Sequence, residues 1–475
     1  MKKNILLIAA IIGYCSAYML SCQHDDSELD ISSIKQINAT PNSIPQGGTV
    51  DLTVDIDPIG TATFLWNSSM GSFSDAQNDS TTWTAPDAPG IYVISLVVTD
   101  DVGTNVGTVN IGVDVYIPEV SPSYVGTDNC TQCHSEITDT WHDTGHAHAV
   151  ETLTNIGQAG NARCLGCHTV GHDDTIDNGG YDEVPVSRLA DVACESCHGP
   201  ASEHNGELAG IDISFDANTC GQCHQDEHHP YIEEWEESAH ATSADLGFVN
   251  ANDRCVKCHI SEAFVAFTKT GTTPKAADLG DNINPINCQS CHDSHSAENP
   301  GQLRYASADL LCGECHTSGS IDDFDDPGEP HHPQWNMLHG TDGLEYAGVT
   351  YEDSPHQFVV ENTCASCHVS MEGFGGEGSP AKTGHTFEPE LRSCTTCHPS
   401  ATDFDVNGVQ TRITALIDQL HAELDAATVA DSATVAFKQA SFNLHFVEAD
   451  ASHGVHNYKY AKALLESSIG NFQPN

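Results

Sequence analysis

The chain has 475 residues and carries 68 Asp and Glu against 16 Lys and Arg, which gives a formal net charge of −52. At roughly 100–200 residues per domain, this length predicts about two to four domains. The acidic excess excludes a nucleic-acid partner, because binding a phosphate backbone requires Lys and Arg to displace counterions. Only 39% of the residues are hydrophobic, whereas His (28) and Cys (20) are abundant. We therefore expect something other than aliphatic side chains to fill part of the interior.

The N-terminus has the pattern of an export signal. A basic start, Met1-Lys2-Lys3, precedes a mostly apolar run at 4–14 that is too short for a membrane-spanning helix of about 20 residues. The run leads to Met19-Leu20-Ser21-Cys22, which resembles a bacterial lipoprotein cleavage box whose Cys becomes the lipidated first residue. An ordinary signal with a Cys of no role is the alternative. We expect a lipoprotein signal peptide at 1–22 and an acidic tether at 23–32, with anchoring to the outer membrane or cell surface, or otherwise a periplasmic location.

Residues 33–118 contain no Cys and form short alternating apolar runs separated by Gly- and Pro-rich turns. This pattern predicts an all-β sandwich. The stretch Thr82-Trp83-Thr84-Ala85-Pro86, followed by Gly90-Ile91-Tyr92-Val93-Ile94, resembles a bacterial immunoglobulin-like or PKD-type module. A spacer role is favoured over a partner-binding surface. The runs lie at 50–56, 61–66, 92–98 and 108–116.

The remaining cysteines carry the chemistry. After Cys15 and Cys22, all eighteen fall in nine copies of Cys-x-x-Cys-His. In this motif two thiols add to the vinyl groups of a haem, and the adjacent His becomes the proximal ligand of the iron. The copies are Cys130-Cys133-His134, Cys164-Cys167-His168, Cys194-Cys197-His198, Cys220-Cys223-His224, Cys255-Cys258-His259, Cys288-Cys291-His292, Cys312-Cys315-His316, Cys364-Cys367-His368 and Cys394-Cys397-His398.

Two other uses of these cysteines fit less well. A disulfide framework does not place His after every second Cys, and zinc ribbons do not require that His. The motifs therefore predict nine covalent haems c. Successive first cysteines lie 34, 30, 26, 35, 33, 24, 52 and 30 residues apart. About thirty residues per haem cannot build nine separate hydrophobic pockets, so we expect the haems to pack against one another and to pass electrons along the chain of irons.

Nine bis-His irons need nine further histidines. Trp141 to His146 and Trp235 to His240 share one form, Trp, four residues and His-Ala, which suggests duplicated haem-binding units. His-His-Pro also occurs twice, and the sequence does not decide which His of each pair is the ligand. The distal candidates are His146, His204, His228 or His229, His240, His295, His331 or His332, His356, His385 and His456. His142, His148, His172, His339, His445 and His453 stay in reserve.

The middle of the chain also resembles a family. Tyr124-Val125-Gly126-Thr127 before the first motif, and Cys194-Glu195-Ser196-Cys197-His198-Gly199-Pro200, resemble tetrahaem cytochromes c that accept electrons from hydroxylamine oxidoreductase. The resemblance covers about 124–400 and implies the stacked and perpendicular haem pairs shared with multihaem nitrite and hydroxylamine enzymes. The nine sites are a departure from this family. We expect a loop- and short-helix-rich multihaem domain at 124–402.

Residues 403–475 have a helical pattern after the last Cys. Apolar residues recur at helical spacing from Ile413 to Leu424, and two further helices are expected at 432–449 and 458–469, broken at Gly454. The stretch 454–461, Gly-Val-His-Asn-Tyr-Lys-Tyr-Ala, resembles the C-terminal helices of ammonia-forming nitrite reductases. That resemblance implies a haem-ligating His456 and helices able to self-associate. A helical bundle that caps the haem core is the simpler interpretation.

Three functions fit these features. The favoured one is an electron carrier in extracellular or periplasmic electron transfer, with redox proteins or an extracellular acceptor as partners. The second is a reductase or oxidase of nitrite, hydroxylamine or tetrathionate, which needs an iron with an open axial position. The Cys-x-x-Cys-Lys motif that often marks such an iron is absent from the sequence, and the negative charge would repel anions. The third is a subunit of a filament or larger complex.

Overall fold

The computed structural model of the chain describes residues 33–57, 61–100, 103–115, 117, 122–176, 178–204, 206, 208–280, 283–319, 321–376 and 379–472. The signal peptide, the tether and Cys22 lie outside these ranges. The chain divides into two compact units, the second of which begins at Pro122. Among the described residues, no helix combines the length and the apolar character that crossing a membrane requires.

The first unit is a β-sandwich, as the alternating runs predict. One antiparallel sheet has the order β1 (Ser33–Thr40), β3 (Thr49–Asp57), β6 (Ser80–Thr84), β5 (Ser72–Phe73). The other has the order β2 (Ser43–Ile44), β8 (Thr104–Val113), β7 (Gly90–Thr99), β4 (Thr63–Ser68), with β2 parallel to β8. Both sheets contribute side chains to one core, which includes Leu52, Trp83 and Leu96.

The predicted runs fall in β3, β4, β7 and β8, with shifted ends. Strand β8 begins at Thr104, four residues before the predicted start, because it pairs with β7 along its whole length, from Thr99↔Thr104 to Gly90↔Val113. Strand β6 is only five residues long and polar except for Trp83, so its alternation was too weak to predict it. Its place in the sheet comes from pairing with β3.

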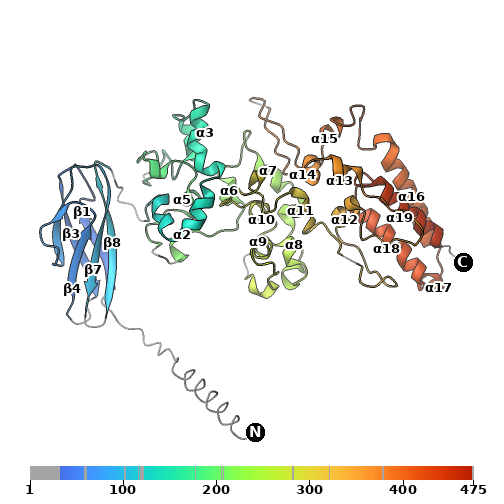
Figure 1. Ribbon diagram of the computed structural model, residues 1–475, viewed down its shortest axis with the longest axis horizontal. Helices are drawn as coiled ribbons and strands as arrows, with labels where there is room; N and C mark the ends of the chain where they lie inside the picture. Colours follow the sequence, from blue (N-terminus) through green and yellow to red (C-terminus); the bar gives the residue numbers. More distant parts are fainter. Residues whose placement is uncertain are drawn as a thin grey trace, which may run out of the picture. The chain divides into compact units, whose positions relative to one another are not determined.

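The first part of the second unit consists of short helices joined by loops, as expected (Figure 1). Left-handed glycines end two of them, Gly271 (φ 68°) after α9 and Gly340 (φ 63°) after α12. The helices are α2 (Thr127–Trp141), α3 (Ala149–Asn155), α4 (Ala162–His168), α5 (Cys194–His198), α6 (Asn218–Gly221), α7 (Tyr231–Glu236), α8 (Val256–His259), α9 (Ser261–Thr270), α10 (Cys288–Cys291), α11 (Ala308–Gly313), α12 (Gln334–His339), α13 (Pro355–Val359), α14 (Thr363–His368) and α15 (Leu391–Thr395).

The C-terminal part of this unit is helical, again as predicted. Helices α16 (Val409–Asp425), α18 (Val435–Asp450) and α19 (Tyr458–Asn471) pack against one another, and the short α17 (Val429–Ser432) precedes α18 (Figure 1). Ile413, Leu420 and Phe446 are fully buried in their core. In contrast, the described apolar clusters between 249 and 315 contain only a few buried residues each. This difference accords with an interior that aliphatic side chains do not fill.

Candidate haem-binding sites

Three of the nine motifs lie whole within a short helix, which places their reactive groups on one face. We number the sites 1 to 9 in chain order, from His134 in site 1 to His398 in site 9. Helices α4, α5 and α14 end at the motif His, so the two Cys and the His, spaced i, i+3 and i+4, share one face. All eighteen cysteines of the described residues are free thiols. The donor set therefore fits a covalently attached haem with a proximal imidazole.

A second imidazole faces most motif histidines at the separation that one iron between them requires. Metal–nitrogen bonds are about 2 Å long, and a ring centre lies roughly 1 Å further, so two axial rings have centres about 6 Å apart. Every such partner is one of the predicted distal histidines. The ring centres join His134 to His204 (6.4 Å), His198 to His295 (6.1 Å), His224 to His146 (6.1 Å), His259 to His332 (6.4 Å), His292 to His385 (6.3 Å), His316 to His240 (6.1 Å), His368 to His456 (6.2 Å) and His398 to His356 (6.4 Å).

Site 2 lies beside the first His-His-Pro segment. Burial lowers the pKa of His229, and His228 and the motif histidine His168 lower it further, while the ring centre of His229 also lies 6.3 Å from that of His224 in site 4. His228 instead packs its ring against Phe374, with centres 3.9 Å apart. His229 is therefore the better placed of the two for site 2.

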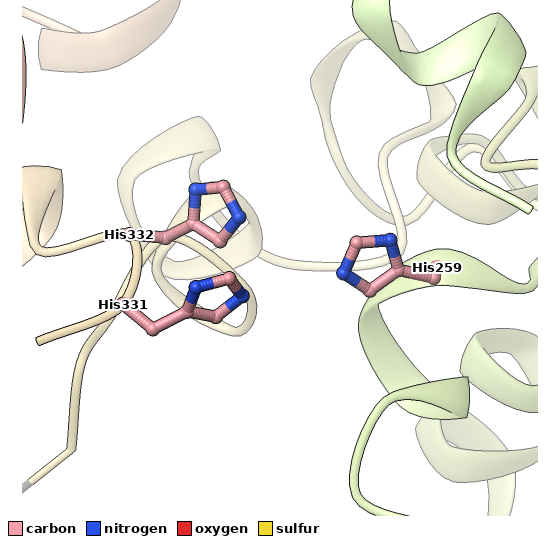
Figure 2. A group of neighbouring side chains, drawn as sticks. All are labelled: His259, His331 and His332. Atoms are coloured by element: carbon pink, nitrogen blue, oxygen red, sulfur yellow. The ribbon is translucent and has the colours of Figure 1, made fainter. Parts of the chain in front are cut away.

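Site 5 faces both histidines of the second His-His-Pro segment. Figure 2 shows His331 and His332 side by side on one strand of chain, with His259 opposite them. The ligating atoms of all three lie within 4.8 Å of one another. His332 has a left-handed backbone (φ 53°), which turns its side chain to the same side as that of its neighbour. Either histidine is within reach of a metal bound to His259.

Several candidate axial imidazoles are oriented through Nδ1, which leaves Nε2 for a metal. The Nδ1 atom of His168 lies 2.9 Å from the carbonyl oxygen of Ala149, and that of His292 lies 2.6 Å from Gly301 O. His198, His259, His368 and His356 pair in the same way with Asp212 O, Ser243 O, Phe387 O and Val455 O. Such a partner fixes the ring and its tautomer.

Burial lowers the pKa of several of the imidazoles, which favours the neutral state that binds a metal. Burial lowers the pKa of His224 and of His240 to about 4, with neighbouring histidines adding to the shift. Burial likewise lowers the pKa of His146 and His292. His456 is an exception, because Asp450 overcomes the effect of burial and raises its pKa.

Cysteines of different motifs are neighbours, which links the nine sites. Thiols of different motifs lie close enough to shift one another's pKa, most strongly Cys130 with Cys194, Cys167 with Cys223, Cys220 with Cys288, Cys258 with Cys315 and Cys312 with Cys364. Electrostatic interactions join Cys197 to Cys220, Cys291 to Cys315 and Cys367 to Cys394. The sites therefore form one line in the order 1, 3, 4, 6, 7, 8, 9, with site 2 attached to site 4 and site 5 attached to site 7.

These contacts repeat along the chain. In the first set, site 1 is linked to site 3, and sites 2 and 3 are both linked to site 4. The second set has the same links: site 4 to site 6, and sites 5 and 6 to site 7. Sites 7, 8 and 9 continue the line without a side branch. The motifs of sites 7 and 8 are separated by a single interval of 52 residues. At the same place in the first two sets there are two shorter intervals, with the motif of the branch site between them. The duplicated Trp-x4-His segments are part of this repeat, because His146 faces site 4 and His240 faces site 7.

Several reserve histidines have other partners. His339 Nε2 lies 3.1 Å from Asp309 Oδ1, His445 Nδ1 lies 2.7 Å from Glu329 Oε2, and His148 Nδ1 lies 3.3 Å from Glu151 Oε2. His453 Nδ1 lies 3.2 Å from Thr414 Oγ1. These contacts account for four of the six reserves without a haem.

Three carboxylates that hold the sites in place were not predicted. Glu195 accepts from backbone groups next to site 1, Glu234 accepts from the loop of His385, and Asp450 accepts from His456. Each of these contacts joins residues distant in the chain or across a helix end. The sequence around Glu195, Cys-Glu-Ser-Cys, shows only that an acidic residue stands inside a motif, and no local pattern marks the other two.

Comparison with known proteins agrees with the motifs. A family model described as cytochrome c554 and c-prime matches residues 129–199, and one described as outer membrane cytochrome MtrC/MtrF-like, domains II/IV, matches residues 281–436. The C-type polyheme cytochrome OmcB of Geobacter sulfurreducens is 24% identical over 234 residues, which are 46% of this chain and 26% of OmcB. The chain is a multihaem c-type cytochrome. As such it contains covalently bound haem c.

Two other curated cytochromes are similar to this cytochrome. Cytochrome c-554 of Nitrosomonas europaea is 33% identical over 100 residues, covering 18% of this chain and 41% of that protein. The multiheme cytochrome MtrA of Shewanella baltica is 24% identical over 223 residues, covering 46% of this chain and 56% of MtrA. The matches thus span about a quarter to just over half of the curated relatives' length.

A solved structure has a similar fold. The undecaheme cytochrome from the S-layer of Carboxydothermus ferrireducens superposes with a TM-score of 0.54 at 20% identity, covering 76% of this chain and 71% of that one.

Proposed function

We propose that this protein is an exported nonahaem cytochrome c that carries electrons along its line of sites in extracellular or periplasmic electron transfer. The observation that carries the proposal is the unbroken series of neighbouring cysteines that influence one another electrostatically, from Cys130 in site 1 to Cys394 in site 9. A haem at each site would exchange single electrons with its neighbours. The protein's own contribution is to hold the attachment points close together and to saturate the irons.

The proposed axial ligands are the nine motif histidines together with the histidines that face them. For site 2 we propose His229, because His168 influences its pKa and His228 packs against Phe374 instead, and for site 5 either His331 or His332. Saturated irons exchange electrons but offer no position for a substrate, which favours a carrier over a reductase. The net charge of −52 also disfavours small anions as substrates.

The series of sites supports a specific route. Electrons would pass through sites 1, 3, 4, 6, 7, 8 and 9, while sites 2 and 5 would lie off the route as reservoirs or points of exchange. The relatives named outer membrane and S-layer cytochromes support a location outside the cytoplasm for this chain. The acceptor would then be a redox protein or an extracellular oxidant.

The test uses the purified full-length protein. We expect nine haems per chain in a pyridine haemochromogen assay and only low-spin ferric signals by electron paramagnetic resonance, unchanged by nitrite or hydroxylamine. Dithionite-reduced protein should be reoxidised completely by a soluble ferric chelate. A high-spin iron whose signal shifts with nitrite would overturn the carrier in favour of a reductase, and six or fewer haems would overturn the count.

We also propose that Cys22 carries a lipid that anchors the protein to the outer membrane or cell surface, with the immunoglobulin-like sandwich as a spacer. The support is the lipoprotein-like box at Met19-Leu20-Ser21-Cys22. Cys22→Ala should move the protein from the membrane fraction to the soluble one, whereas the matched change Cys15→Ala should not. Membrane retention of Cys22→Ala would contradict the anchor. Size-exclusion chromatography of the detergent-free variant would separate a monomer from a filament subunit.

A further inference from the structure

We propose that Asp450 sets the reduction potential of site 8 below those of the two sites in the equivalent position of the repeat, sites 3 and 6. The inference rests on the proposed ligation of site 8 by His456. It concerns the chemistry of one site rather than the overall route. Asp450 acts through His456 and is therefore a positioning and tuning residue.

The contact between Asp450 and His456 is short, and its carboxylate is buried. The Nδ1 atom of His456 lies 2.5 Å from Asp450 Oδ1, and the Asp450 side chain has no exposed surface. Ser452 donates its hydroxyl to the other carboxylate oxygen and also accepts from the backbone N–H of His456. Asp450 is the last residue of α18, where the helix dipole disfavours a negative charge. The imidazole N–H and the serine hydroxyl compensate for that cost.

The three equivalent distal histidines provide an internal comparison. His295 of site 3 has Asp293 3.5 Å from its Nδ1, but both side chains are substantially exposed, at 49% and 32%. His385 of site 6 has only neutral partners at Nδ1, the carbonyl and hydroxyl oxygens of Thr383, at 3.1 and 3.0 Å. Site 8 alone among the three combines a short hydrogen bond with a fully buried carboxylate.

The direction of the effect follows from this difference. A carboxylate that accepts from Nδ1 makes Nε2 a stronger donor to the metal. A stronger donor and a buried negative charge both stabilise ferric over ferrous iron, which lowers the potential, and hydrogen bonding around the ligand and burial are established controls of haem potential. Site 8 lies between sites 7 and 9 on the proposed line. Site 8 would therefore be reduced less readily than sites 3 and 6, and an electron would stay on it only briefly during transfer.

The experiment measures potentials and spin states of the holoprotein. In a spectroelectrochemical titration, Asp450→Asn should raise the potential of one component, with all irons still low-spin. The matched variant Asp293→Asn should shift the potential of its own component less. Asp450→Glu keeps the negative charge, so its potential should stay closer to that of the wild type than the potential of Asp450→Asn does. Unchanged potentials in Asp450→Asn would overturn the inference.

A second variant separates this inference from the ligand assignment. His456→Ala should convert one iron to high spin. If all irons stay low-spin in His456→Ala, the ligation of site 8 is wrong and the inference falls with it. If His456→Ala opens the iron but Asp450→Asn shifts nothing, the tuning role is wrong while the ligation and the electron route stand. Should Asp450→Asn fail to assemble nine haems, Ser452→Ala, which removes only the second hydrogen bond to the carboxylate, should still change the potential of the same component.

Discussion

The buried carboxylate of Glu195, inside the third motif, accepts a 2.7 Å hydrogen bond from the backbone N–H of Gly126, the residue just before the helix of the first motif. It also accepts from the N–H groups of Val125 and Ala201. One side chain therefore fixes sites 1 and 3 relative to each other.

Glu195→Gln should destabilise this end of the protein. The amide offers one accepting oxygen where the carboxylate serves three backbone donors, so at least one buried N–H loses its partner, at a cost of about 1–3 kcal/mol. Thermal unfolding of the holoprotein would measure the loss. The exposed Glu136→Gln makes the same charge change and should have little effect. Equal stability of the two variants would contradict the role of Glu195.

The same carboxyl group predicts a pH dependence. Burial raises the pKa of Glu195 above its ordinary value of 4.5, despite its hydrogen bonds from Val125, Gly126 and Ala201. The folded protein then binds a proton that the unfolded chain releases, so the contribution of Glu195 is fully present below pH 4.5 and declines as pH rises through the folded pKa. The difference in melting temperature between wild type and Glu195→Gln, which cannot titrate, should therefore shrink on going up from pH 4.5. A difference that grows with pH would contradict this sign.

Glu234→Gln should loosen the distal ligand of site 6. The carboxylate accepts from the backbone N–H groups of Thr383 and His385, at 2.9 and 2.8 Å, and from the Thr383 hydroxyl at 2.7 Å. Losing one of these partly buried bonds costs about 1 kcal/mol. We expect a lower melting temperature and a fraction of one iron in the high-spin state. The exposed neighbour Glu236→Gln is the control, and identical spectra for the two variants would reject the prediction.

Site 5 should tolerate the loss of either of its facing histidines. Because the ligating atoms of His259, His331 and His332 lie within 4.8 Å of one another, His331→Ala and His332→Ala should each leave every iron low-spin. The double variant should leave one iron high-spin. The comparison is His385→Ala, where a single change should open an iron, because His385 is the histidine whose ring faces His292. A high-spin iron in His331→Ala or His332→Ala would show that this residue is the sole ligand.

Removing sites one at a time should distinguish the line from its branches. Cys255→Ala with Cys258→Ala removes site 5, and Cys312→Ala with Cys315→Ala removes site 7. Each variant should lose one haem, so the two variants are matched in the number of haems removed. Conductance across a film of the protein should fall far more for site 7 than for site 5, because site 7 alone joins site 6 to site 8 in the series of contacts. Equal losses would refute the branched route.

The sequence could predict the sites better than their arrangement. A motif is local, so Cys-x-x-Cys-His identifies each attachment point without knowledge of the fold. The facing imidazoles come from far along the chain: His198 and His295 are 295 − 198 = 97 residues apart. His146 follows the first motif yet faces His224 rather than His134. Such pairings depend on how the loops pack, which periodicity does not report.

The fold followed the same rule. Helix α16 shows its buried side in the spacing of Ile413, Ile417 and Leu420, so its existence could be predicted. Strand β1 could not be predicted, because it is defined by its pairing with β3 rather than by a pattern of its own. The pairing includes a shift of register between Ile34 and Gln36. Asp450 is the clearest omission at the sites, since nothing in α18 itself indicates that its last carboxylate meets a histidine six residues later.

The repeated set of sites, complete twice and lacking its branch the third time, bears on how such a protein lengthens. A tandem duplication of one set would lengthen the line by a fixed amount, because the last site of each set already neighbours the first site of the next. The third set shows that the side position can be dropped without cutting the through-connection. The length of the line of sites and the number of branch sites, which sets how many electrons can be stored, can thus change independently of each other.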